Sequence, residues 1–197
     1  MVGNLLAYPN QEYLESLPLA AAEAKELASG SDDRFTDVIL EFIDATLATA
    51  PPELAERYVA IYDHTPAASL YLSWHRYGND RSQGKAMAAL NGLYRTAGFE
   101  PVPGCLPDYL PRMLEFLSVA PDWACEALLD GFGPEMAAIL ETLAEYKSPH
   151  SKMLKQVLLP FMEKYPGLFK PRTIDPTRRP MACPEPEPME PLIPVTK

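Results

Sequence analysis

The placement of histidine limits the chemistry of this chain more than any other feature. The sequence has His64, His75 and His150, and none belongs to a His-x-x-x-His or Glu-x-x-His pair, so we predict no metal enzyme built on one helix. Asp63 and His64 stand in the reverse order of a metal-phosphohydrolase pair, and further ligands at suitable spacing are missing. Ser73 points away from His75 on a helix, which disfavours a nucleophile–base pair. A helical hydrolase therefore remains a minor alternative.

The cysteines indicate the cellular compartment. Cys105, Cys125 and Cys183 are an odd number of thiols without Cys-x-x-Cys spacing, which favours reduced cytoplasmic thiols over a disulfide framework or a zinc ribbon. No apolar run reaches the roughly 18 residues of a membrane span, and the N-terminus lacks the pattern of a leader. We therefore expect a cytoplasmic protein with no membrane span.

The net charge of −10 falls entirely within residues 1–170, because four basic and four acidic residues cancel within 171–197. An acidic folded part repels the phosphates of nucleic acids, so we predict no nucleic-acid partner. The same surface attracts cationic partners over roughly a Debye length.

Aromatic and polar side chains concentrate in the middle of the chain: Tyr58, Tyr62, Tyr71, Trp74, His75 and Tyr77. Tyr58 and Tyr62 are four residues apart and therefore share one helix face. One interpretation is ordinary core packing, which aromatic residues at helical spacing usually indicate. The other is a groove lined by amphipathic rings that holds an apolar peptide helix.

Apolar residues recur at three- and four-residue steps, which predicts an all-α, single-domain helical bundle. Asp80 and Asp108 are expected to cap the helices that follow them, and Pro160 to kink or break the last helix. Prolines and glycines concentrate in residues 98–107, which predicts a connector. Helices are expected over residues 11–28, 31–47, 51–63, 69–77, 80–98, 108–117, 122–130, 134–146 and 151–165.

The helical domain is expected to cover residues 1–170. Residues 171–197 contain eight prolines, and proline cannot maintain the hydrogen bonding of a helix or a sheet. We therefore predict a disordered or loosely docked tail.

Four segments in collinear order carry a resemblance to a known family: YVAIYD at 58–63, SLYLSWHRYG at 69–78, LPDYLP at 106–111 and LEFL at 114–117. They resemble the NarJ family, the molybdenum-cofactor assembly chaperones of respiratory nitrate reductase, which are related to the TorD-like chaperones. The resemblance implies an all-α fold and a cytoplasmic, non-catalytic chaperone that holds no cofactor stably. Such a chaperone binds the N-terminal segment of an apo molybdoenzyme catalytic subunit, assists insertion of the molybdenum cofactor, and is absent from the final enzyme.

The resemblance leaves the identity of the client open. Tyr62, Tyr77, Asn79-Asp80 and Gln83 depart from residues common in the family. The client is therefore expected to be the catalytic subunit of nitrate reductase or of a related molybdoenzyme. Proteins that synthesise the cofactor are further candidate partners, and a permanent helical scaffold subunit of a redox complex is the alternative function.

Seven residues are predicted to bind the client peptide. The aromatic rings would bury its apolar face, and the carboxylates would meet its amide or basic groups. They are Tyr58, Tyr62, Tyr71 and His75 in the aromatic region, with Asp108, Tyr109 and Glu115 at the connector and the helix after it.

Overall fold

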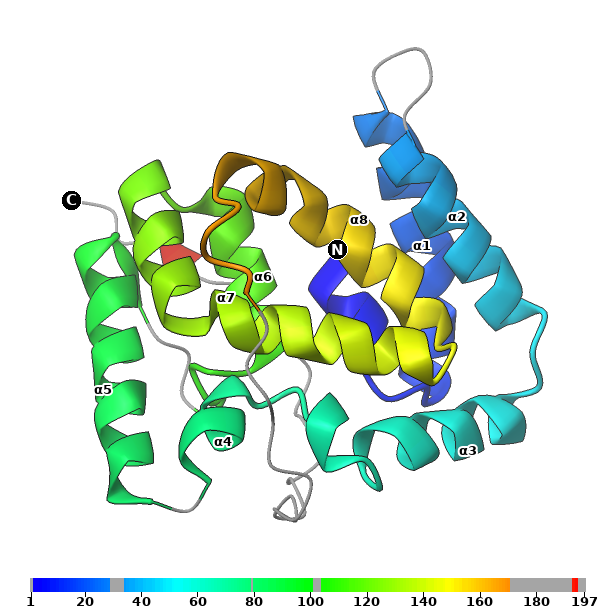
Figure 1. Ribbon diagram of the computed structural model, residues 1–197. Helices are drawn as coiled ribbons and strands as arrows, with labels where there is room; N and C mark the ends of the chain where they lie inside the picture. Colours follow the sequence, from blue (N-terminus) through cyan, green and yellow to red (C-terminus); the bar gives the residue numbers. More distant parts are fainter. Residues whose placement is uncertain (1, 29–33, 79, 101–103, 171–192, 195–197) are drawn as a thin grey trace.

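The computed structural model describes residues 2–28, 34–78, 80–100, 104–170 and 193–194. Within them the chain is almost entirely helical, as the sequence predicts (Figure 1). The elements in chain order are η1 (Val2–Leu6), α1 (Gln11–Leu27), α2 (Arg34–Leu47), α3 (Pro51–Tyr62), η2 (Pro66–Ala68), α4 (Leu72–Tyr77), α5 (Arg81–Thr96), β1 (Phe99–Glu100), α6 (Leu110–Val119), α7 (Asp122–Glu145), α8 (Pro149–Lys164) and β2 (Ile193–Pro194).

Side chains at helix starts explain where several helices begin. The Asn10 side chain accepts a hydrogen bond from the Tyr13 N–H at 2.8 Å, and Asp80 accepts one from Ser82 at 2.7 Å, as predicted for Asp80. These contacts satisfy N–H groups that have no partner inside the helix. The start of the helix expected over residues 31–47 lies outside the described residues up to residue 33.

α7 is a single helix that continues through Gly131, Gly133 and Pro134, whereas the sequence predicts two helices, at 122–130 and 134–146. That prediction was wrong, because contacts with distant segments stabilise the interrupted region. The Arg76 guanidinium of α4 donates to the Gly131 carbonyl at 2.6 Å, and Leu168 packs directly against Gly133. α8 likewise continues through Pro160 without a break.

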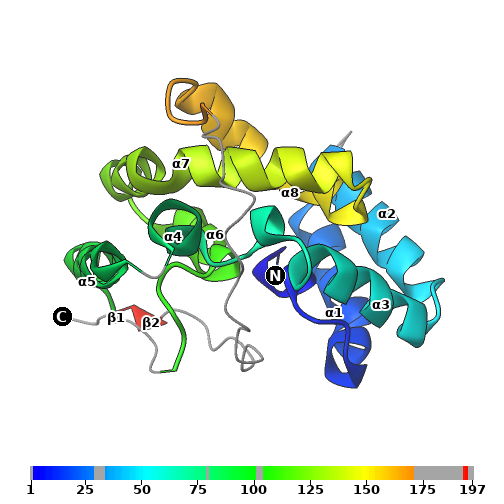
Figure 2. The same cartoon turned by 60° about the horizontal axis from the view of Figure 1, so that its bottom comes forward.

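Two groups of helices share the central helices α7 and α8 (Figure 2). η1, α1, α2 and α3 lie on one side of the molecule, and α4 and α5 lie on the other, with α6 and α7 between them. α8 packs against both α7 and α2, so the last helix joins the N-terminal helices to the centre of the bundle. η1 packs against α6, with Leu5 and Leu6 buried in the core.

After α8 the chain turns back over α7 and buries Phe169. Of the predicted tail at 171–197, the structure describes Ile193 and Pro194, which form β2. β2 pairs antiparallel with β1, with Phe99 opposite Pro194 and Glu100 opposite Ile193. β1 lies inside the predicted connector at 98–107.

None of the helices in the described part of the chain is both long and apolar enough to cross a membrane.

Candidate functional site

Four of the seven predicted client-binding residues lie together and form a tyrosine cluster, defined here as Tyr58, Tyr62, Tyr71 and Tyr109. The rings of Tyr58 and Tyr62 are 4.5 Å apart, and those of Tyr71 and Tyr109 are 5.0 Å apart. Burial raises the pKa of Tyr58, and the nearby hydroxyls of Tyr109 and Tyr62 raise this pKa further. Tyr62 and Tyr109 are buried, whereas Tyr58 and Tyr71 are partly exposed. Only part of the cluster can therefore meet a ligand at the surface.

Backbone hydrogen bonds join Tyr71 and Tyr109 through two short segments, 70–73 and 108–110, which we call the junction. The Leu72 N–H donates to the Asp108 carbonyl at 3.0 Å, and the Leu110 N–H donates to the Leu70 carbonyl at 2.7 Å. Tyr71 and Tyr109 face each other across this short antiparallel bridge. The junction therefore fixes the start of α4 against the start of α6.

Asp108 is fully buried in the junction and caps α4 rather than the helix that follows it. Its carboxylate accepts hydrogen bonds from the Ser73 N–H at 2.9 Å and the Ser73 hydroxyl at 2.6 Å. Burial raises the pKa of Asp108, and the two bonds from Ser73 oppose that rise. The prediction that Asp108 caps the next helix was wrong, because Tyr109 is the N-cap residue of α6 and makes no side-chain cap.

His75 and Glu115 have partners of their own. A ring nitrogen of His75 lies 2.7 Å from the Ser69 carbonyl, and burial lowers the pKa of His75. Glu115 accepts a hydrogen bond from Arg112 at 2.7 Å on the same helix. His75 is buried, while Glu115 keeps a quarter of its side chain exposed.

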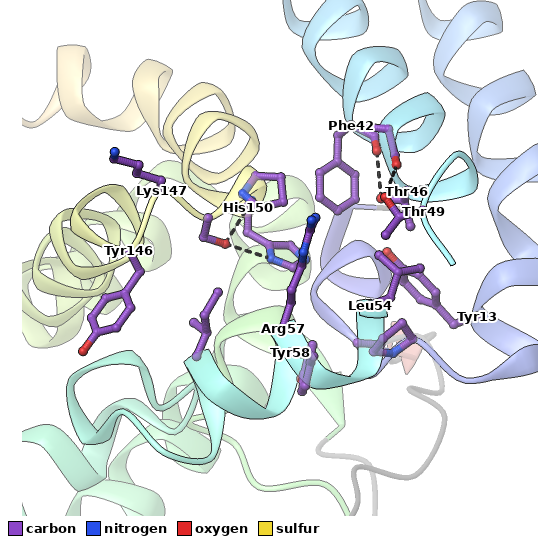
Figure 3. A pocket seen from close by; sticks show the side chains of 16 residues that line it. Tyr13, Phe42, Thr46, Thr49, Leu54, Arg57, Tyr58, Tyr146, Lys147 and His150 are labelled. Carbon is purple, nitrogen blue, oxygen red and sulfur yellow. Dashed lines mark hydrogen bonds between the residues drawn. The ribbon is translucent and has the colours of Figure 1, made fainter. Parts of the chain in front are cut away.

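A cavity of about 520 Å³ opens beside the tyrosine cluster, and Tyr58 is the predicted site residue that lines it. Its other walls come from the chain between η1 and α1, from α2, and from the turn between α7 and α8 (Figure 3). Most of these residues are not among those predicted from the sequence to bind the client. Phe42 could be predicted only as core, and nothing in the sequence places residues 146–150 next to α2 and α3. The largest side chains of its lining are Tyr13, Phe42, Leu54, Arg57, Tyr58, Ile61, Tyr146, Lys147 and His150.

His150 forms an uncharged part of the cavity wall. Its ring is 5.0 Å from the Phe42 ring and 5.6 Å from the Tyr62 ring. Removal from solvent lowers the pKa of His150 to about 4, although a hydrogen bond to the Leu5 carbonyl opposes this shift. The imidazole is therefore neutral at pH 7.

The lining of the cavity is suited to apolar side chains. The Thr46 hydroxyl donates to the Phe42 carbonyl and the Thr49 hydroxyl donates to the Ala45 carbonyl, at 2.8 Å in each case. Their donors are thus already used, which leaves aromatic and aliphatic groups to make most of the surface. The charged side chains of this lining, Arg57 and Lys147, are both basic. Such a lining is suited to burying an apolar group.

A second cavity of about 280 Å³ continues the first along α2 and shares Phe42, Ala45, Lys147, Ser148 and Pro149 with it. We call the two together the groove. Its far end is lined by Val38, Glu41, Ser151 and Lys152.

In the parts of the chain that the structure describes, no three His, Cys, Asp or Glu residues are grouped so that they could hold a metal ion.

Comparison with known proteins places these features in a family. The family model described as nitrate reductase delta subunit matches residues 25–165. The chain is 28% identical over 159 residues to the probable nitrate reductase molybdenum cofactor assembly chaperone NarJ of Bacillus subtilis, covering 81% of this chain and 84% of that protein.

Two further relatives are covered less completely. Identity is 28% over 162 residues to the nitrate reductase molybdenum cofactor assembly chaperone NarJ of Escherichia coli, covering 80% of this chain and 66% of that protein. It is 31% over 153 residues to the nitrate reductase-like protein NarX of Mycobacterium tuberculosis, of which the chain spans 22%. Because the family model covers most of the helical body, including the tyrosine cluster, the junction and α2 to α8, this chain belongs to the nitrate reductase delta subunit family.

Proposed function

We propose that the protein is a non-catalytic chaperone that binds the N-terminal segment of an apo molybdoenzyme catalytic subunit and assists insertion of the molybdenum cofactor. The client is the catalytic subunit of nitrate reductase or of a related enzyme, and the chaperone is absent from the mature complex. Membership of the family supports this function, as do the names of the relatives from Bacillus subtilis and Escherichia coli.

The apolar cavity beside Tyr58 is the observation that carries the proposal. Its volume of about 520 Å³ lies within the usual range of ligand pockets, roughly 300 to 1,000 Å³. An amphipathic helix binds such a groove by inserting a few apolar side chains from one face. Phe42 and Ile61 supply apolar walls, and Tyr58 supplies an aromatic wall whose hydroxyl already donates to the Leu6 carbonyl at 3.2 Å.

Other predicted residues support the cavity from behind in this proposal. Tyr62 packs under Tyr58, and Tyr109 and Tyr71 lie close enough to influence the Tyr58 hydroxyl. A client side chain that displaces Tyr58 would therefore press on the junction. Asp108 would act as a positioning residue for this wall, because it fixes Ser73 and the start of α4.

Calorimetry with a cavity-filling variant tests the binding site. The probe is a synthetic peptide that copies the first residues of the molybdoenzyme catalytic subunit encoded in the same genome. We expect micromolar or tighter binding to the unmodified protein. Ala45→Trp should weaken it at least about tenfold, because Ala45 is exposed and lines both parts of the groove.

Ala60→Trp is the matched control, since Ala60 is exposed on α3 and lies outside the groove lining. This variant should bind the peptide as the unmodified protein does. Equal binding by both tryptophan variants would move the site away from the groove, and no binding to the unmodified protein would contradict the proposed client segment.

The cellular role has its own readout. Deletion of the gene should leave the client enzyme with little molybdenum, measured by metal analysis of the purified catalytic subunit. The mature enzyme purified from normal cells should lack this chain. If the mature enzyme instead contains this chain in equal amount with the catalytic subunit, the chain is a permanent scaffold subunit.

A further inference from the structure

Lys147 adopts a backbone conformation that its residue type disfavours. Among the described residues it is the non-glycine residue with a positive φ, at 51°. This left-handed conformation brings the side chain of an L-residue close to its own backbone, and glycine avoids the cost. A lysine at such a position therefore needs an explanation other than backbone preference.

The end of α7 shows that glycine would serve this position structurally. The Ser148 N–H donates to the Leu143 carbonyl at 2.9 Å, and the Lys147 N–H donates to the Ala144 carbonyl at 3.0 Å. These two bonds form a Schellman motif, whose left-handed residue is most often glycine. Residues in unfavourable backbone conformations concentrate at functional sites.

The position of Lys147 in the groove supplies an independent observation. Lys147 is exposed and lines both cavities that make up the groove. In Figure 3 the side chain of Lys147 points away from Phe42, so its ammonium lies away from the apolar floor of the cavity. It can therefore meet the polar side of a bound segment whose apolar side faces the floor.

The other charged residues along the groove already have partners. Arg57 pairs with Glu53 one turn away on α3, and Lys152 pairs with Glu41 at 2.9 Å. Lys147 forms no ion pair with any residue that the structure describes. In a chain of net charge −10, the rim of the groove thus presents an unpaired cation.

We propose that Lys147 is a specificity residue of the groove, which binds a carboxylate on the polar side of the client's N-terminal segment. This inference rests on the proposed function and names the chemistry of its partner: an amphipathic segment with an Asp or Glu at the edge of its apolar face. The acidic surface of the body attracts basic groups at long range, whereas Lys147 selects an acidic group at short range.

Two substitutions separate the charge of Lys147 from its backbone conformation. Lys147→Asn removes the ammonium and tolerates the left-handed conformation, and Lys147→Gly removes both the charge and the strain. Lys155→Gln is the control, because Lys155 is exposed on α8 and lies outside the groove lining.

Calorimetry and thermal melting of the full chain give the readouts. The probes are the peptide that copies the client N-terminus and versions in which each Asp or Glu is changed to its amide. Lys147→Asn and Lys147→Gly should raise the melting temperature by about 2 to 4 °C and weaken peptide binding about fivefold. One amide peptide should bind the unmodified protein equally weakly, and it should lose nothing further with Lys147→Asn.

A rise in melting temperature with unchanged affinity would overturn the inference, since a residue with only a structural role changes stability alone. A client segment without Asp or Glu, or amide peptides that all bind as the parent does, would overturn it too. In each of these cases the unmodified protein still binds the peptide, so the proposed function stands. Absence of any binding to the unmodified protein would instead overturn the proposed function and this inference together.

Discussion

His150 makes the stability of the fold depend on pH in a direction that can be worked out. Its pKa is about 4 in the folded protein, compared with about 6.5 in an unfolded chain. Between these values the unfolded chain binds a proton that the folded protein does not, so stability falls as the pH falls. We expect His150 to account for a loss of about 2 kcal/mol between pH 7 and pH 5. Burial also lowers the pKa of His75, so His75 too makes stability fall as the pH falls.

Chemical denaturation at the two pH values checks this prediction. His150→Gln should destabilise the protein more at pH 7 than at pH 5, because the glutamine does not titrate. His64→Gln is the comparison, because it removes an imidazole at an exposed position. An equal effect of His150→Gln at the two pH values would show that the imidazole is not held neutral by the fold.

At the same scale, residue type predicts some contacts and cannot predict others. Asp80 caps the helix that follows it, because the Ser82 N–H that donates to it is only two residues away in the sequence. Asp108 has the same type and a similar position before a helix, yet it caps α4 through Ser73, 35 residues away. The choice between a local and a distant partner depends on the junction, which forms only when the two segments meet. No local pattern contains that information.

At the scale of the elements, the close approach of Leu168 to α7 predicts the effect of a small substitution. A Cβ atom at Gly133 would lie 2.4 Å from the Leu168 carbonyl oxygen, so Gly133→Ala must shift the backbone after α8. We expect a loss of about 1 to 3 kcal/mol in the free energy of unfolding. Gly131→Ala, in the same helix with open space around its Cβ position, should instead be neutral or stabilise by up to about 1 kcal/mol. Urea denaturation measures the free energy of unfolding of both variants. Equal values for the two would show that a Cβ atom at Gly133 does not clash with Leu168.

The helices themselves were largely predictable. Apolar periodicity located α2 and α3 to within a few residues, because the periodicity of a helix is a property of a short segment. It failed for α7, where Pro134 and two glycines interrupt the pattern while Arg76 and Leu168 hold the helix together from outside. The site shows the same limit. Tyr58 could be selected from its sequence neighbours, whereas Phe42 and His150 join it only through the packing of α2 against α8.

For the molecule as a whole, the buried Phe169 marks where the chain can be shortened. Truncation after Lys170 retains Phe169 and should change the melting temperature by no more than about 2 °C, because the two-residue pairing of β2 with β1 adds few contacts. Truncation after Tyr165 also removes Leu168 and Phe169 and should lower the melting temperature by about 5 °C or more. A large decrease with the first truncation would show that residues beyond 170 contribute substantially to the body.

The burial of η1 has a consequence for synthesis on the ribosome. Leu5 and Leu6 are translated long before α6, the helix against which η1 packs, because α6 begins only at Leu110. α2 likewise packs against α8, which begins only at Pro149, so this contact cannot form until α8 has been translated. η1 and α2 therefore leave the ribosome with exposed apolar faces and cannot complete their packing until α6 and α8 have been translated. A protein that we propose shields a segment of another chain thus leaves its own early helices without their packing partners until α6 and α8 have been made.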